Sequence, residues 1–188
     1  MCKALFTGVC TAMVTPFLDG KINYPMMEIL LQRQMEANIP AVVIAGTTGE
    51  SATLTDEEKI KLFYHCKKIL ENQTLMIAGT GSNNTAHSIA LSIAAENAGA
   101  DYIGVGAVFG TSTKKNARNL TVQKLREITN AVSIPVVAIG GINAQNLMGL
   151  KDSGVDGVAV VSAIFAAEDP GRATRELLAL AQEMVARG

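Results

Sequence analysis

The sequence predicts an α/β protein in which six βα units build one parallel sheet. Short, mostly apolar, β-branched runs alternate with helical patterns along the whole chain, which is typical of such units. Each run is followed by Gly, Ser or Thr before the next helix begins. The 188 residues suffice for one domain but fall short of the roughly 250 residues of a complete eight-unit barrel. We therefore expect a single domain over residues 1–188, a parallel (βα)₆ assembly that is a shortened relative of the (β/α)₈ barrel.

The expected strands are apolar throughout, as strands covered on both faces by helices should be. They are Val9–Thr15, Ala41–Ala45, Leu75–Ala78, Tyr102–Val105, Pro135–Ile139 and Val158–Val161. The helices between them are predicted from apolar spacing and from residues that cap helix ends.

The first helix is expected from about Tyr24 to Asn38, with Met26, Ile29, Leu30 and Met35 on its inner face. The second begins with a capping box from Thr55 to Glu58, in which each side chain bonds the other residue's amide. We expect Ile60, Phe63, Ile69 and Leu70 to face the core behind it.

Four more helices follow. Asn84 or Thr85 caps the third, whose predicted core residues are Ile89, Ile93 and Ala94 and which ends at Gly99. The fourth follows Thr121, the fifth runs from Asn143 to Gly154, and the sixth starts at Asp169 and Pro170.

Composition argues against several function classes. A net charge of −1 and a pI near 6.1 do not favour nucleic acid or an anionic membrane as a partner, and the chain has no Trp for base stacking. No apolar run approaches the roughly 18 residues of a membrane span. The three cysteines, Cys2, Cys10 and Cys66, have no metal-ligand spacing, so we expect a reduced, cytoplasmic protein without a metal or cofactor.

The segment Gly46-Thr47-Thr48-Gly49-Glu50-Ser51 follows the second predicted strand. It resembles the dihydrodipicolinate synthase and N-acetylneuraminate lyase family, and that resemblance extends over residues 6–99. It implies that Thr47 and Thr48 hold the carboxylate of a 2-keto acid, which hydroxyls and amides can bind without a full charge. The alternative is a glycine-rich turn that only connects a strand to a helix.

The same resemblance implies a lysine for a Schiff base and a tyrosine for proton transfer. This sequence departs from the family on both points. Ala107-Val108-Phe109-Gly110 stands where the tyrosine motif is expected, and the last two predicted strands contain no lysine. We therefore do not expect aldol chemistry.

Two neighbouring strand ends in the second half predict a phosphate-binding cup. Gly140-Gly141-Ile142-Asn143 leads from a strand into a predicted helix, and Val161-Ser162-Ala163 follows the next strand. Amides at such ends favour an anion. Residues 101–184 resemble thiamine phosphate synthase, and this resemblance implies that Gly140, Gly141, Val161 and Ser162 hold a phosphate. The alternative is that the glycines serve close packing and that Asn143 is only an N-cap.

A second anion site is implied by the same resemblance. Thr111, Thr113 and Lys114 match residues that contact pyrophosphate in that family, although Ala107 and Gly110 replace prolines found in many members. The alternative is a polar surface loop. The synthase's pyrimidine and magnesium residues belong to its first half, which is replaced here. Glu50 is the one acid at the predicted strand ends of the first half, so we predict no metal site and no confident catalytic residue.

Both families form TIM barrels, and the two resemblances meet near Ala98–Asp101. They divide the domain into lyase-like units over residues 1–99 and synthase-like units over residues 100–188. We predict a TIM-barrel-like engineered chimera that keeps a phosphate-binding cup but lacks a complete catalytic set, while a natural fusion remains open. The alternatives are a thiamine phosphate synthase-like transferase, a dihydrodipicolinate synthase-like lyase and a ligand-free scaffold. Phosphate or a small phosphorylated ligand is the expected partner. The unpaired edges of the first and last strands also suggest a homodimer.

Overall fold

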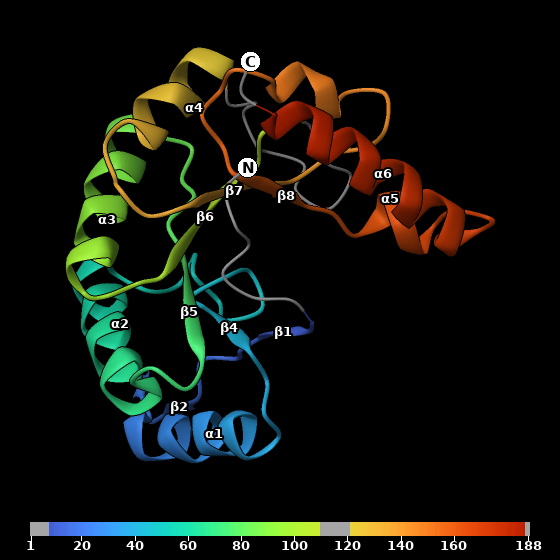
Figure 1. Cartoon of the computed structure of the whole chain (residues 1–188). Helices are drawn as coiled ribbons and strands as arrows, with labels where there is room; N and C mark the ends of the chain where they lie inside the picture. The colour runs from blue at the N-terminus through green and yellow to red at the C-terminus, as the bar shows by residue number, and fades with distance from the viewer. Residues whose placement is uncertain (1–7, 110–120, 187–188) are drawn as a thin grey trace. The chain divides into compact units, whose positions relative to one another are not determined.

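The computed structural model describes residues 8–109 and 121–186. Its contacts divide the chain into two compact units. The N-terminal unit ends at Thr80 and also includes Ala90–Gly104, while the C-terminal unit combines Gly81–Ile89 with the described residues from Val105 onward. Figure 1 shows the helices and strands of both units.

The six predicted strands are confirmed, most of them within one or two residues at either end. The parallel strands follow one another in chain order as β1, β4, β5, β6, β7 and β8. Their bounds are Cys10–Ala12, Ala41–Ile44, Leu75–Gly79, Tyr102–Gly106, Val136–Ile139 and Gly157–Ala159. The fold is therefore the parallel α/β arrangement that the alternating pattern predicts.

A short antiparallel hairpin, β2 (Phe17–Leu18) with β3 (Lys21–Ile22), was not predicted. Asp19 and Gly20 connect its strands with φ of 51° and 74°. An Asp-Gly pair with two positive φ angles is the preferred two-residue hairpin turn, so the signal was present in the sequence.

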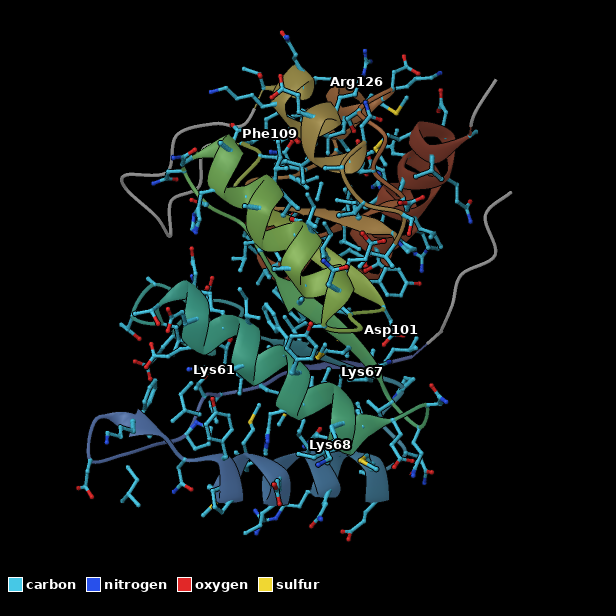
Figure 2. All side chains as sticks on the ribbon, turned by 90° about the vertical axis from the view of Figure 1, so that its left-hand side faces the viewer. Lys61, Lys67, Lys68, Asp101, Phe109 and Arg126 are labelled. Carbon is cyan, nitrogen blue, oxygen red and sulfur yellow. The ribbon has the colours of Figure 1, made fainter. Side chains whose placement is uncertain are left out.

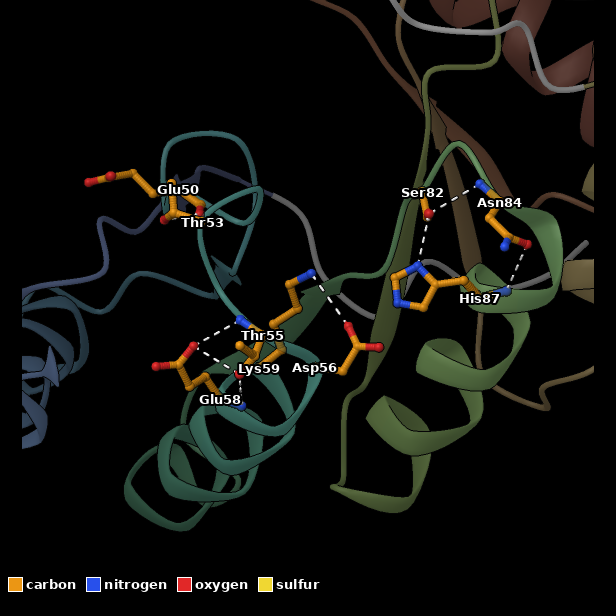
Figure 3. Close-up of polar contacts among 9 residues, drawn as sticks. All are labelled: Glu50, Thr53, Thr55, Asp56, Glu58, Lys59, Ser82, Asn84 and His87. Atoms are coloured by element: carbon orange, nitrogen blue, oxygen red, sulfur yellow. Dashed lines mark hydrogen bonds and ion pairs between the residues drawn. The ribbon is translucent and has the colours of Figure 1, made fainter. Parts of the chain in front are cut away.

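The helices of the N-terminal unit are α1 (Tyr24–Glu36), α2 (Asp56–Leu70) and most of α3 (Thr85–Asn97). The capping box that opens α2 is confirmed. The Thr55 amide donates to Glu58 Oε2 at 2.8 Å, and the Glu58 amide donates to Thr55 Oγ1 at 3.2 Å (Figure 3). The Thr55 amide and the Thr55 hydroxyl both donate to Glu58 Oε2 and lower the pKa of that carboxyl below its usual value, because they stabilise the charged form.

The predicted inner faces of α1 and α3 are wrong. In α1, Met27 and Leu31 are fully buried, whereas Met26 and Ile29 are 42% and 43% exposed. In α3, the buried residues include Ser88, Leu91, Ser92 and Ala95, while Ile93 is 40% exposed. The α2 face is shifted as well and buries Lys59, Leu62 and Cys66 beside Phe63 and Leu70.

The C-terminal unit contains α4 (Val122–Thr129), the 3₁₀ helix η1 (Leu147–Leu150), α5 (Ser162–Phe165) and α6 (Pro170–Val185). The fifth helix predicted from Asn143 to Gly154 is therefore wrong, since only one 3₁₀ turn forms there. Asp169 caps α6 as predicted, accepting from the Arg172 amide at 2.9 Å. Helix α5, which follows β8 directly, was not predicted.

An aspartate directly before β6 and another directly before β8 each form two hydrogen bonds to the preceding parallel strand. We call this pair of bonds the aspartate clasp. Asp101 donates its amide to the Met76 carbonyl at 2.9 Å and accepts the Met76 amide on Oδ2 at 2.8 Å. Asp156 bonds Val136 in the same way, at 2.9 and 3.0 Å. Each aspartate comes two residues after a glycine with positive φ, Gly99 at 87° and Gly154 at 85°.

The Asp101 clasp also holds a cation. Lys67 Nζ from α2 lies 3.0 and 2.8 Å from the two carboxylate oxygens of Asp101, and both side chains are 23% exposed (Figure 2). A helix, two strands and the loop between them are thus connected through one carboxylate.

Candidate functional site

The predicted phosphate cup lies in the C-terminal unit, where β7 and β8 end together. Ile139 is the register partner of Ala159, so the segments that begin at Gly140 and Val160 leave the same edge of the sheet. Polar groups that follow the two strands are therefore brought close to each other, as the sequence predicts for parallel strands.

Gly140 and Gly141 have different roles in this edge. A Cβ atom on Gly140 would lie 2.8 Å from the Cβ of Ala107, so a side chain is excluded there by packing. The Gly140 carbonyl also accepts the Phe109 amide at 3.1 Å. Gly141 has a φ of 66°, and its amide donates no hydrogen bond within the described residues. Gly140 therefore fits the packing alternative, and Gly141 keeps an amide for a ligand.

Asn143 supports a turn instead of opening a long helix. Its Oδ1 accepts the amides of Gln145 and Asn146, and its own amide donates to Asn146 Oδ1 at 2.9 Å. Asn146 Nδ2 further donates to the Gly141 carbonyl at 2.8 Å. The amides of Gln145, Asn146 and Leu147 are thus satisfied within the turn, whereas those of Gly141 and Ile142 donate to no described group.

Val161 and Ser162 continue from the end of β8. Val161 is 71% exposed and serves as the N-cap of α5, with no side-chain capping bond. Its carbonyl accepts the amides of Ile164 and Phe165. The amides of Ser162 and Ala163 donate to no group in the described part of the chain. The two strand ends thus present several amides without an acceptor there, among them those of Gly141, Ile142, Ser162 and Ala163.

A hollow of about 290 Å³ lies beside the end of β8, between the Asn143 turn and helices α5 and α6. Its polar lining residues are Asn143, Gln145, Ser162 and Glu176, and its apolar residues are mainly alanines. Ser162 belongs both to this hollow and to the strand end that presents free amides.

The second predicted anion site, Thr111, Thr113 and Lys114, lies outside the described residues. The carboxylate-binding remnant, Thr47 and Thr48, lies in the N-terminal unit in a turn after β4. The Gly46 carbonyl accepts the amides of Gly49 and Ser51 there. Thr15 Oγ1 holds the turn by donating to the Gly49 carbonyl at 2.7 Å. Thr47 and Thr48 are exposed, and neither their hydroxyls nor their amides bond another described residue.

Both histidines have partners that sequence spacing did not predict. His87 Nδ1 lies 2.9 Å from Ser82 Oγ, and the His87 amide donates to Asn84 Oδ1 (Figure 3). His65 Nε2 lies 3.3 Å from Glu28 Oε1 of α1, within ion-pair distance but without the geometry of a hydrogen bond. The Ser82-x-Asn84 pattern before a helix, typical of turns that end in a cap, was the available signal for His87.

Burial raises the pKa of the Cys10 thiol to about 11 and that of Cys66 to about 12, since burial disfavours a thiolate. Among the residues that the structure describes, no three His, Cys, Asp or Glu side chains gather as metal ligands. No helix in this part of the chain is long and apolar enough to cross a membrane.

The sequence profile of the family described as thiamine monophosphate synthase matches residues 66–164, more than half of the chain. The chain belongs to the thiamine monophosphate synthase family. The match contains β7, the Gly140–Gly141 pair and the Ser162 strand end. Thiamine-phosphate synthase of Pyrococcus abyssi is 48% identical over 101 residues, which are 54% of this chain and 49% of that protein.

A second enzyme family is equally similar. The 4-hydroxy-tetrahydrodipicolinate synthase of Fervidobacterium nodosum is 48% identical over 99 residues, 53% of this chain and 34% of that protein. The enzyme of Bdellovibrio bacteriovorus is 40% identical over 132 residues, 70% of this chain and 44% of that protein. The chain thus spans about half the length, or less, of the curated relatives it matches. Its mixed resemblance to two families is confirmed.

Solved structures agree with the predicted fold. The structural match with a dihydrodipicolinate synthase covers 94% of this chain and 62% of the other chain, with a TM-score of 0.75 and 24% identity. The match with the dihydrodipicolinate synthase of Acinetobacter baumannii, solved in complex with pyruvate, covers 77% of this chain and 52% of the other chain. Its TM-score is 0.66 and its identity 28%. The TIM-barrel-like class is therefore confirmed for this thiamine monophosphate synthase relative.

The two family matches overlap along the chain. A match of 132 residues to the dipicolinate enzyme and a profile match over residues 66–164 cannot lie side by side within 188 residues. The profile match also begins in α2, ahead of Ala98–Asp101. The join near Ala98–Asp101 therefore remains a prediction.

Proposed function

We propose that this chain binds the phosphate group of a small phosphorylated molecule at the edge where β7 and β8 end. The observation that carries the proposal is that several amides at the two strand ends, among them those of Gly141, Ile142, Ser162 and Ala163, donate to no described group. Backbone amides that lack an acceptor cost free energy unless water or a ligand accepts from them. A phosphate has several strong acceptor oxygens and can accept from both strand ends at once.

The backbone at Gly141 supports an anion at this edge. With φ at 66° it lies in the left-handed region, where successive amides can converge on one anion. Glycine also leaves no Cβ between a ligand and the amide of the next residue. The match to the thiamine monophosphate synthase family, which includes both strand ends, supports a phosphorylated ligand further.

We propose binding without the complete chemistry of either related family, in a chimeric chain that joins parts of both. Thr47 and Thr48 form a second candidate anion site in the N-terminal unit, since their amides and hydroxyls bond no described residue. The solved dihydrodipicolinate synthase of Acinetobacter baumannii is a complex with pyruvate, which supports a 2-keto acid as the anion at this turn. A transferase and a lyase remain the competing functions.

The phosphate proposal predicts a ligand-dependent melting temperature. Phosphate at one hundred times its dissociation constant should stabilise the fold by about 2.7 kcal/mol, or roughly 5–10 °C for a chain of this size. Gly141→Leu should abolish the shift by placing a side chain beside the amides. The measurement is thermal unfolding followed by circular dichroism across a phosphate titration.

Gly20→Leu is the matched control for this titration. Gly20 has a φ of 74°, close to that of Gly141, but lies in the β2–β3 turn, where a Cβ atom would meet nothing within 4 Å. It should lower the melting temperature through the same backbone strain and keep the phosphate shift. A shift that survives in Gly141→Leu would place the anion elsewhere.

We also propose that the chain self-associates through a sheet edge. Within the described residues β1 pairs only with β4, and β8 pairs only with β7. Val9 and Val14, which flank β1, are 66% and 51% exposed. Neither Val9 nor Val14 carries a charge that would keep another chain away from this edge. An apolar strand edge without such a charge favours pairing with another chain.

Light scattering over a concentration series should therefore give a mass that rises from one chain to two. Val9→Lys should hold the protein monomeric by placing a charge beside the free edge. Ile93→Lys adds the same charge to the 40%-exposed Ile93 on α3 and should leave association unchanged. A single-chain mass for the unsubstituted protein at all concentrations would contradict this proposal.

A further inference from the structure

The hollow beside Ser162 is lined by polar residues, three of which bond no other described residue through their side chains. Ser162, Gln145 and Glu176 line it, and none of their side chains forms a hydrogen bond or ion pair in the described part of the chain. They come from three separate elements, namely α5, the Asn143 turn and α6 (Figure 1). The rest of the lining is made mainly of alanine methyl groups and Leu177.

Among the described residues that line the hollow, Glu176 is the only charged one. Arg172 and Arg175 lie on the same helix, but they do not line the hollow and form no ion pair with Glu176. The hollow therefore offers a carboxylate, which accepts hydrogen bonds, beside a hydroxyl and an amide that can accept or donate. A group that carries positive charge and several N–H donors complements this set.

We propose that the hollow binds the organic part of a small phosphomonoester that carries an ammonium group. The inference rests on the proposed phosphate site and adds the class of ligand. Ser162 connects the two, because its amide belongs to the free strand-end amides and the residue also lines the hollow. The volume of about 290 Å³ equals that of about ten water molecules in the liquid and suits a short aminoalkyl chain.

The test compares O-phosphoethanolamine with ethyl phosphate, which has the same phosphate and a similar length but no amine. Isothermal titration calorimetry on the full chain should show O-phosphoethanolamine binding about fivefold more tightly, the upper end of what an exposed ion pair contributes. Glu176→Gln keeps the shape of the side chain and should remove the preference, leaving the affinity for ethyl phosphate unchanged.

Glu183→Gln is the control variant, because it removes the same charge from α6 at a residue outside the hollow. It should preserve the fivefold preference. Equal affinities for the two compounds in the unsubstituted chain, or a preference that persists in Glu176→Gln, would overturn the ammonium site while leaving the phosphate proposal intact. Failure of both compounds and of inorganic phosphate to bind would overturn both.

Discussion

Asp101→Ala should lower the free energy of unfolding by about 3 kcal/mol. The change leaves Lys67 without its carboxylate and the Met76 amide without its acceptor. Removing one partner of a fully buried ion pair costs about 3–5 kcal/mol, and the 23% exposure of both side chains reduces that cost. An amide left unsatisfied adds about 1–3 kcal/mol. Urea unfolding followed by circular dichroism measures the loss.

Two further variants separate these contributions. Asp101→Asn keeps an oxygen for the Met76 amide and loses the charge, so about 1 kcal/mol is expected. Lys67→Met removes the cation and leaves the clasp in place. A loss in Asp101→Asn as large as that in Asp101→Ala would show that the ion pair, and not the bond to the strand, stabilises this corner.

Gly79→Ala should cost about 3 kcal/mol, near the upper end for overpacking. A Cβ atom on Gly79 would overlap the Ala45 carbonyl oxygen and lie 2.8 Å from the Ala45 carbonyl carbon. Backbone atoms cannot rotate away as a side chain can. The strand ends of β4 and β5 would have to separate, which would also displace the Thr47–Thr48 turn.

Gly157→Ala in β8 provides the comparison for Gly79→Ala. No atom lies within 4 Å of the position that a Cβ would take at Gly157, so alanine should leave stability unchanged or raise it by up to about 1 kcal/mol. Equal urea midpoints for the two variants would mean that β5 can move away from β4 at little cost.

The strands were predictable because their apolar runs are short and separated by glycine and hydroxyl residues. The buried faces of the helices were harder to predict than the strands. In α1, Met26, Met27, Ile29, Leu30 and Leu31 are all apolar, so periodicity allows more than one inner face. In α3 the buried positions include serines, and Ser92 Oγ donates to Thr80 Oγ1 at 2.9 Å. Apolar spacing cannot find a helix that packs through small hydroxyl residues.

The candidate site was predictable at its strand ends and not in the turn between them. Glycine at Gly141 and the hydroxyl at Ser162 are visible in the sequence as anion-binding signals. The bonds between Asn143 and Asn146, which consume the amides expected for the cup, depend on how two side chains fold back. Glu176 was not predicted, because an exposed glutamate on a helix resembles any other until a hollow forms beside it.

The aspartate clasp has a consequence for how neighbouring strands keep their register. In the clasp itself, Asp101 and Asp156 each bond a backbone amide and a backbone carbonyl of the preceding strand, groups that nearly every residue provides, although Asp101 also pairs with the Lys67 side chain. A segment that begins with Gly-x-Asp therefore carries its own attachment to whatever strand comes before it. The clasp bonds therefore hold the register between two strands without depending on the side chains of the earlier strand.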